Sequence, residues 1–338
     1  MKAKKHRIRF ILLILILLTL YIILALLPRP QSLHMDNPLR TDSSMPMLVA
    51  HGGGNGEFPD NTLEAFYNAY SVDPQVVMET DVNLTKDGIL ILSHDTTLDR
   101  KTNVTGPICE WNYSDLIAEK VDFGYNNPTI DETLSGERQR YKDGKGSEKT
   151  PLDVTYPEGV LPRDETVFLA TTLEDLLLAF PTNLISVEIK QPGELGQKAL
   201  QETLRLLKEY DAFDRVVIGS FYPEIHDTLQ QLQREGQLPD ELLFSANEYH
   251  VTKFFILQLL KLDFFFGDNI CILQIPPEEY GIPLNIRGLV KAAHNHNIAV
   301  QYWTINEEEE MRHLIEIGAD GITTDYPHLL KEVYENSP

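Results

Sequence analysis

The stretch 184-LISVEIKQPGELGQKALQETLRLLKEYDAFDRVVIGS-220 holds one complete unit of the fold. Residues 184–190 and 216–220 are short apolar runs rich in β-branched side chains, which is typical of buried strands. Between them, residues 196–210 place apolar side chains at the spacing of an amphipathic helix. Strands joined by a helical crossover lie parallel in one sheet. The stretch therefore predicts a β–α–β unit of an α/β protein.

The same alternation continues on both sides of this unit. Strands are predicted at residues 47–50, 76–81, 89–93, 184–190, 216–220, 242–245, 271–275, 299–304 and 321–324, and helices at 61–70, 173–180, 196–210, 223–235, 251–262, 286–295 and 307–316. Such repeats form either a (β/α)8 barrel or a doubly wound sheet. The strands are one too many for a plain barrel, so one of them is accessory or wrongly assigned. The gap between residues 81 and 89 is too short for a helical crossover.

Residues 107–163 interrupt this rhythm, and their part 131–158 is rich in glycine, proline and charge. A loop of this length in a compact domain is usually functional or disordered. Because it follows a strand that ends at His94-Asp95, we expect it to overhang the mouth of the barrel.

The N-terminus predicts a membrane anchor. Residues 10–27 are apolar except for Thr19 and Tyr21, and a helix of this length spans roughly 27 Å. Residues 1–9 contain a cluster of lysines and arginines. By the positive-inside rule this end lies in the cytoplasm and the rest of the chain outside it, at the cell membrane. Residues 28–46 form a linker and 47–338 the barrel. A cleaved signal peptide is the alternative, but the apolar run is longer than usual for one.

The charge and the cysteines exclude several classes of protein. The formal net charge is −22, and all 51 acidic residues follow the anchor, so the exported part repels nucleic acid. A phosphate substrate would need a local cation. The two cysteines form neither a disulfide framework nor a zinc motif. We expect Cys109 and Cys271 to stay unpaired, since Cys271 lies in an apolar run that reads as a buried strand.

A second apolar stretch, residues 254–266, contains five phenylalanines. We expect it to pack against the strands as core. The alternative is that part of it lies in the bilayer surface.

Polar residues gather at the predicted strand ends, which open onto one mouth in a barrel. They are His51, Glu79, Asp81, His94, Glu188 and Lys190. Three carboxylates in one place repel each other unless a cation lies among them, and a hard divalent ion with oxygen ligands is the simplest solution. Two histidines beside a phosphate can act as general acid and base, and a lysine can hold the phosphate as a point charge.

Short motifs at these positions resemble the glycerophosphodiester phosphodiesterase family in its usual order. They are AHGG at 50–53, PDNTLEAF at 59–66, ETDV at 79–82, LTKDG at 84–88, SHD at 93–95, EIK at 188–190, SF at 220–221, YWTIN at 302–306 and GADGITTDYP at 318–327. The resemblance covers nearly everything after residue 48. It implies a TIM-like (β/α)8 barrel with an insertion after the third strand, which residues 107–163 match in position.

The resemblance also implies roles for single residues. It implies metal ligands at Glu79, Asp81 and Glu188, binding Ca²⁺ or Mg²⁺, general acid/base roles for His51 and His94, phosphate contact by Lys190, and packing of Trp303 against the glycerol or head group. A core aromatic is the alternative for Trp303. The implied reaction is hydrolysis of a glycerophosphodiester to an alcohol and glycerol 3-phosphate.

Two positions depart from the family pattern. Gly52 stands where the family usually has an arginine that contacts phosphate. Asp60 replaces a glutamate, and Asp60 or Asn61 can still cap the following helix. The lost arginine leaves two alternatives open: a phosphodiesterase for lysophospholipids or other membrane lipids, and a catalytically impaired binding protein on the same scaffold.

Overall fold

A computed structural model of the protein describes residues 2–31, 37–41, 43, 45–126, 139–240 and 242–337. Eight parallel strands make up its centre. They are β1 (Met47–His51), β2 (Val77–Leu84), β4 (Ile185–Ile189), β5 (Val216–Gly219), β6 (Leu243–Phe244), β7 (Ile272–Ile275), β10 (Ala299–Tyr302) and β11 (Gly321–Thr324). Their order is β6-β5-β4-β2-β1-β11-β10-β7.

The two outer strands of this order, β6 and β7, also meet. A parallel bridge joins Ser245 to Ile272. The backbone N–H of Cys271 donates to the carbonyl of Phe244 at 3.0 Å, and that of Ala246 to Ile272 at 2.9 Å. The sheet is therefore a nearly closed barrel, as predicted, and the doubly wound alternative is wrong.

The ninth predicted strand is accessory. β3 (Leu90–Leu92) pairs antiparallel with β2, with Val82 opposite Leu92, and its Ile91 forms an isolated antiparallel bridge to Thr172. The turn between them contains Gly88 at φ +82°, a conformation that glycine adopts without strain. Because this hairpin prolongs the pairing, β2 runs to Leu84 and does not end at Asp81 as the sequence predicted.

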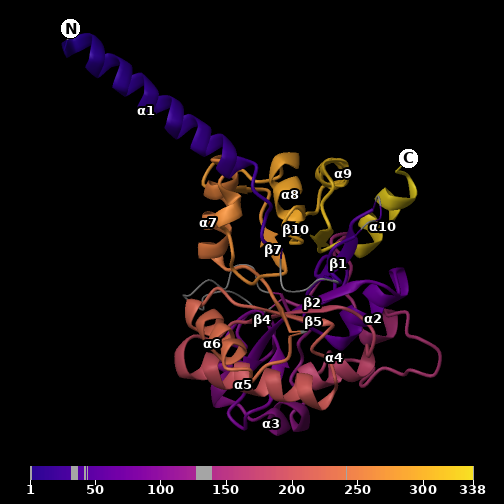
Figure 1. Ribbon diagram of the computed structural model, residues 1–338. Coiled ribbons are helices and arrows are strands. Elements are labelled where there is room, and N and C mark those ends of the chain that lie inside the picture. The colour runs from indigo at the N-terminus through magenta and orange to yellow at the C-terminus, as the bar shows by residue number, and fades with distance from the viewer. Residues whose placement is uncertain are drawn as a thin grey trace.

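Helices surround the strands as a ring (Figure 1). They are α2 (Leu63–Val72), α4 (Leu173–Ala179), α5 (Gly193–Glu209), α6 (Pro223–Arg234), α7 (Glu248–Leu259), α8 (Arg287–His294), α9 (Glu308–Ile317) and α10 (Pro327–Glu335). In α5 the buried side chains include Leu200, Leu206 and Leu207, so this helix turns an apolar stripe inward, whereas α7 buries His250 and Gln258 beside Phe254. The seven helices predicted from the sequence are present. The sequence reading missed α10, although proline at its first position is a helix-start signal, and it also missed the short helix at residues 113–118.

The predicted insertion follows β3 and packs on the loop after β1. Tyr141 donates its hydroxyl to the carbonyl of Asn55 at 2.6 Å, and the Gly144 N–H donates to Gly56 at 2.8 Å. Its elements are α3 (Tyr113–Ala118) and two 3₁₀ turns, Ile108–Glu110 and Pro151–Asp153. A small core of its own includes Phe58, Ile91, Leu98, Ile108, Leu116 and Phe168. Residues 127–138 of the insertion lie outside the described residues.

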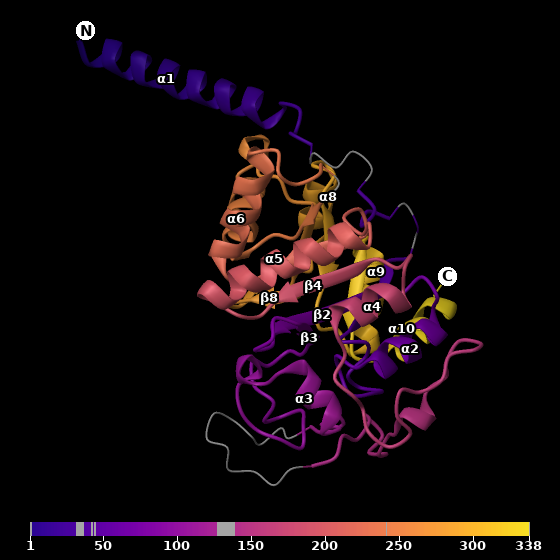
Figure 2. The ribbon, with the colours of Figure 1, turned by 90° about the horizontal axis from the view of Figure 1, so that it is seen from below.

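The N-terminal helix α1 (Lys2–Ala25) projects from the barrel (Figures 1 and 2). Within the described part of the chain, no helix is long and apolar enough to cross a membrane. In the predicted linker, residues 32–36, 42 and 44 lie outside the described part. Cys109 and Cys271 are both free thiols.

The apolar stretch 254–266 is divided between core and surface. Phe254 and Phe266 are fully buried and their rings meet edge to face, 5.0 Å apart. Leu259, Leu260 and Phe265 are exposed. The prediction of a core segment is therefore right for only part of the stretch.

Two buried histidines pack together between α6 and α7, and we expect them to make stability depend on pH. The rings of His226 and His250 lie 5.1 Å apart, and burial lowers the pKa of His226 to about 4. His226 binds a proton near pH 6.5 in the unfolded chain but only near pH 4 in the folded chain. The free energy of unfolding should therefore decrease as the pH is lowered from 6.5 to 4, by up to about 3 kcal/mol from this histidine.

Urea unfolding followed by tryptophan fluorescence between pH 4 and 7.5 measures this loss. Replacing His226 by phenylalanine should flatten the dependence, whereas the same change at the exposed His313 should leave it unaltered. An unchanged slope in His226→Phe would show that other groups cause it.

Candidate active site

The strand pairing brings the predicted site residues together. His51 on β1 lies directly opposite Glu79 on β2, and Asp81 lies opposite Glu188 on β4. Because Glu79 and Asp81 are two residues apart, their side chains point to the same face of the sheet. Lys190 follows β4 immediately. The cluster that the sequence predicted therefore exists, across three adjacent strands.

The three carboxylates form a crowded acidic centre. Burial, with the charge of Asp81, raises the pKa of Glu79 to about 7, and burial also raises the pKa of Glu188. The Gly52 N–H donates to Glu79 at 2.9 Å. The Lys190 ammonium lies 3.5 Å from Asp81 and 3.1 Å from Glu188. Lysine therefore balances part, but not all, of the negative charge.

Asn61 positions Asp81. Its amide nitrogen donates to the Asp81 carboxylate at 3.1 Å, while its amide oxygen accepts from the Thr80 hydroxyl at 2.7 Å and from the Asp81 N–H at 3.2 Å. The predicted role of Asp60 or Asn61 as helix cap is wrong, because the Thr62 hydroxyl caps α2 by accepting from the Ala65 N–H. The asparagine serves the site instead.

His51 is held by a second carboxylate–amide pair. Its Nδ1 lies 2.7 Å from Asp325, which in turn accepts from the Asn306 amide at 2.7 Å. Burial lowers the pKa of His51, but the hydrogen bond to Asp325 and the charge of Glu79 outweigh it and raise the pKa to about 9. Both Asp325 and Asn306 lie in motifs that the sequence had singled out, yet no role was predicted for them.

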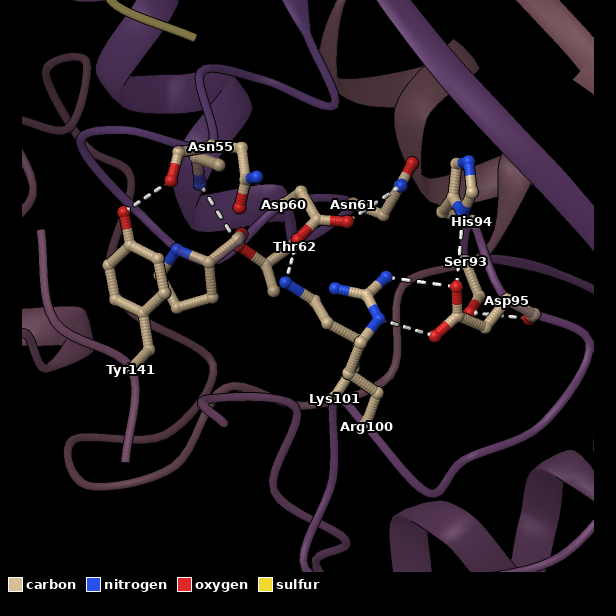
Figure 3. Close-up of polar contacts among 12 residues, drawn as sticks. Asn55, Asp60, Asn61, Thr62, Ser93, His94, Asp95, Arg100, Lys101 and Tyr141 are labelled. Carbon is tan, nitrogen blue, oxygen red and sulfur yellow. Dashed lines mark hydrogen bonds and ion pairs between the residues drawn. The ribbon is translucent and has the colours of Figure 1, made fainter. Parts of the chain in front are cut away.

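His94 stands apart from the barrel strands. It follows the accessory strand β3, and its side chain is about half exposed. Its Nδ1 lies 2.9 Å from Asp95, whose carboxylate also accepts two hydrogen bonds from Arg100, at 2.7 and 2.9 Å (Figure 3). Arg100 and Asp95 thus fix this imidazole, and neither had been predicted.

A buried ion pair lies beside these residues. Lys101 reaches the carboxylate of Asp60 (Figure 3), and both side chains are almost fully buried. Burial lowers the pKa of Lys101 to about 7. The aspartate that replaces the family glutamate therefore has a cationic partner from the segment that leads into the insertion.

The backbone explains why no arginine stands at position 52. Gly52 has φ +54°, and a Cβ there would lie 2.7 Å from the Cβ of Asp60. Gly53 and Gly54 also have positive φ. A side chain at residue 52 would be strained and would clash, so this loop is built for glycine.

Aromatic side chains border the cluster. Trp303 directly follows β10 and is 37% exposed, so it is not a core residue. Phe221 follows β5 by two residues and is exposed, with the Lys190 ammonium 5.8 Å from its ring centroid. Together they offer apolar surface beside the charged centre.

The donor set suits a hard cation, since Glu79, Asp81 and Glu188 offer only oxygen ligands and burial disfavours the charged state of two of them. Among the described residues, however, no three His, Cys, Asp or Glu side chains converge closely enough to hold an ion. The residues therefore fit a divalent cation by chemistry, and the ligand geometry is not formed in this structure.

Histidines and carboxylates that meet at the mouth of a parallel barrel, with a lysine among them, are the groups of a barrel hydrolase for phosphate esters. Comparison with known proteins gives the family. The model of the glycerophosphoryl diester phosphodiesterase family matches residues 51–329, and the chain belongs to this family. Enzymes of this family generally depend on a divalent cation.

Individual relatives agree with this assignment. The chain is 26% identical over 288 residues to a glycerophosphodiester phosphodiesterase of Caldanaerobacter subterraneus, covering 84% of this chain and 96% of that one. It is 26% identical over 341 residues to the human lysophospholipase D GDPD1, covering 92% of each. Its fold matches a phosphodiesterase of Oleispira antarctica in complex with the product sn-glycerol-3-phosphate, with a TM-score of 0.60 and 20% identity over 86% of this chain and 98% of that one.

Proposed function

We propose that this protein hydrolyses glycerophosphodiesters to an alcohol and glycerol 3-phosphate at the mouth of the barrel. The observation that carries the proposal is the pairing of His51 with Glu79 and of Asp81 with Glu188, with Lys190 against the two latter carboxylates. Family membership and the names of the relatives point to the same reaction.

The described contacts suggest how these residues act. Lys190 holds the phosphate as a point charge. One of His51 and His94 takes the proton from the nucleophile, which is either water or the glycerol hydroxyl of the substrate, and the other gives a proton to the leaving alcohol. Asp325 and Asp95 fix the two imidazoles.

Glu79, Asp81 and Glu188 would hold the divalent cation, Ca²⁺ or Mg²⁺. When bound, it supplies a positive charge that polarises a phosphoryl oxygen. Trp303, which directly follows β10 and is 37% exposed, would pack against the glycerol or the head group.

A product assay on the purified protein tests the proposal. Glycerophosphocholine and glycerophosphoethanolamine should each release glycerol 3-phosphate, and chelation should stop this reversibly. Because no arginine follows His51, a charge-assisted hydrogen bond worth roughly 1.5–3 kcal/mol is missing, so the Michaelis constant should be about ten- to a hundredfold higher than with it. A micromolar constant would show that another group holds the phosphate.

The same assay separates the alternatives. Release of choline from lysophosphatidylcholine but not from glycerophosphocholine would support a lysophospholipid phosphodiesterase, the activity in the name of the human relative. Binding of glycerophosphocholine without any product, in the presence of Ca²⁺ or Mg²⁺, would support an impaired binding protein.

We also propose that residues 10–27 anchor the protein in the cell membrane, with residues 1–9 in the cytoplasm and the barrel outside. The apolar side chains from Phe10 to Ile23 are exposed along α1, and basic residues precede them. Release of the full-length protein from membranes by alkaline carbonate would contradict this anchor.

A further inference from the structure

The chain that follows α1 crosses the end of the barrel where the strands begin. Leu39 is buried in a cluster with Val217, Leu243 and Ile272, which lie at the starts of β5, β6 and β7. The Asn37 amide donates to the carbonyl of Cys271 at 2.7 Å, just before β7. Residues 37–41 therefore close the base of the barrel, the end opposite its mouth.

The end of α1 and the residues that follow it are tied to the same side. The Arg29 guanidinium donates to both carboxylate oxygens of Asp263, at 2.7 and 3.0 Å, and Asp263 is only 3% exposed. His296 lies between this carboxylate and the carbonyl of Pro30, at 3.3 and 2.8 Å. A buried, charge-assisted contact of this kind fixes a direction. The helix therefore leaves the barrel at a defined place.

Further contacts strengthen this attachment. The Tyr21 hydroxyl donates to the carbonyl of Leu260 at 2.9 Å, and Arg40 pairs with the buried Asp320 at 2.6 Å, just before β11. Exposed apolar side chains gather beside the end of α1, at Ile256, Leu259, Leu260 and Phe265. Exposed apolar side chains of α7 and of the residues after it thus lie at the end of the barrel where α1 is attached.

The proposed active site lies at the other end. His51 is the last residue of β1, about 13 Å along the strand from Met47 at the base. The insertion, which packs on the loop after β1, is on the mouth side, and in both views α3 and α1 lie at opposite ends of the molecule (Figures 1 and 2).

We infer that the barrel is held with its base toward the bilayer and its mouth away from it, and that its substrate is a water-soluble glycerophosphodiester rather than a lipid in the membrane that anchors it. This rests on the proposed phosphodiesterase activity and on the proposed anchor. A lipid that stays in the bilayer has its phosphate at the membrane surface, whereas the site opens on the far side of the barrel.

The orientation of the barrel on the membrane can be measured by fluorescence quenching, independently of enzymatic activity. The full chain with Cys109→Ser is placed in vesicles that contain a lipid with a quencher on its head group, and a fluorophore is attached at Leu259→Cys, near the base, or at Glu279→Cys, beyond the end of β7. The label at residue 259 should be quenched at least fivefold more than the label at 279. Equal quenching, or the reverse, would overturn the inference.

A variant tests whether the base contacts set this orientation. Arg29→Gln removes the two hydrogen bonds from the guanidinium to Asp263, so the difference in quenching between the two labels should become smaller. Arg205→Gln, which breaks exposed pairs with Glu202 and Glu209 on α5, is the matched control and should leave it unchanged. A difference that survives Arg29→Gln unaltered would contradict the proposed tie.

The substrate arm uses the same vesicles. Turnover of glycerophosphocholine should match that of the detergent-solubilised protein within twofold, while a long-chain lysophosphatidylcholine should react at least tenfold more slowly in the vesicles than in detergent micelles. Equal rates for the lyso-lipid in both would overturn the inference about the substrate. No turnover of either compound in any form would instead refute the proposed function, and the quenching result would still decide the orientation.

Discussion

Glu79→Gln should abolish turnover without weakening the fold. The amide keeps the shape of the side chain but loses the charge that a divalent cation requires, so we expect a loss of at least about a thousandfold, similar in size to the removal of other groups that act electrostatically in the transition state. Removing a charge from a crowded acidic centre relieves repulsion. The melting temperature in chelator should therefore equal or exceed that of the unmodified protein. Glu188→Gln should behave in the same way.

Steady-state assays with added Ca²⁺ or Mg²⁺, together with thermal melts, measure both effects. Glu278→Gln, on the exposed strand β8 (Glu278–Glu279), is a matched control and should be fully active. Thorough chelation should reproduce the loss reversibly in the unmodified enzyme. Full activity of a preparation that elemental analysis shows to be metal-free would refute the metal requirement.

His51→Ala and His94→Ala should each lower kcat by about 10²–10⁴-fold, the usual effect of removing a general acid or base. The fold should persist, because both imidazoles lie at the mouth and neither belongs to the buried core. The exposed His313 on α9 offers a control, and His313→Ala should retain full activity. Losses below tenfold in both variants would exclude the proposed roles.

The two carboxylates that hold the imidazoles have a different role from the imidazoles themselves. Asp325 and Asp95 each hydrogen-bond one of the two histidines, so we expect both to act as positioning residues. Sequence distance explains why the partner of His51 was not predicted, but not why Asp95 was overlooked, since it directly follows His94. A histidine at a strand end is visible in the sequence, but its partner lies 274 residues away for His51.

The barrel could be predicted from local patterns in the sequence. Strands and amphipathic helices alternate with clear periods, and two carboxylates spaced by two residues must share a face of a strand. The roles of Asn61 and Asn306 depend instead on contacts with residues 20 and 19 positions away. No periodicity encodes such contacts. The assignment of helix caps failed at Asn61 for the same reason, since the amide is used by a neighbouring strand.

Boundaries were less predictable than elements. The strand predicted at residues 299–304 ends at Tyr302, and the helix predicted at 251–262 begins at Glu248, because Asn247 caps it by accepting from the His250 N–H. Lys101 was missed because a lysine in a polar segment ordinarily lies at the surface. In the folded protein its side chain is buried against Asp60.

The two histidines of the site are held in different ways, although β3, which precedes His94, also pairs with β2 and packs Leu90 and Leu92 in the barrel core. His51 ends a strand of the barrel, whereas His94 follows a hairpin strand whose Ile91 packs in the separate core of the insertion, with Ile108 and Phe168. The packing of the small core therefore contributes, together with the barrel core, to the position of His94 relative to His51. A change of packing in the insertion can therefore move His94 relative to His51 while every strand of the barrel stays as it is.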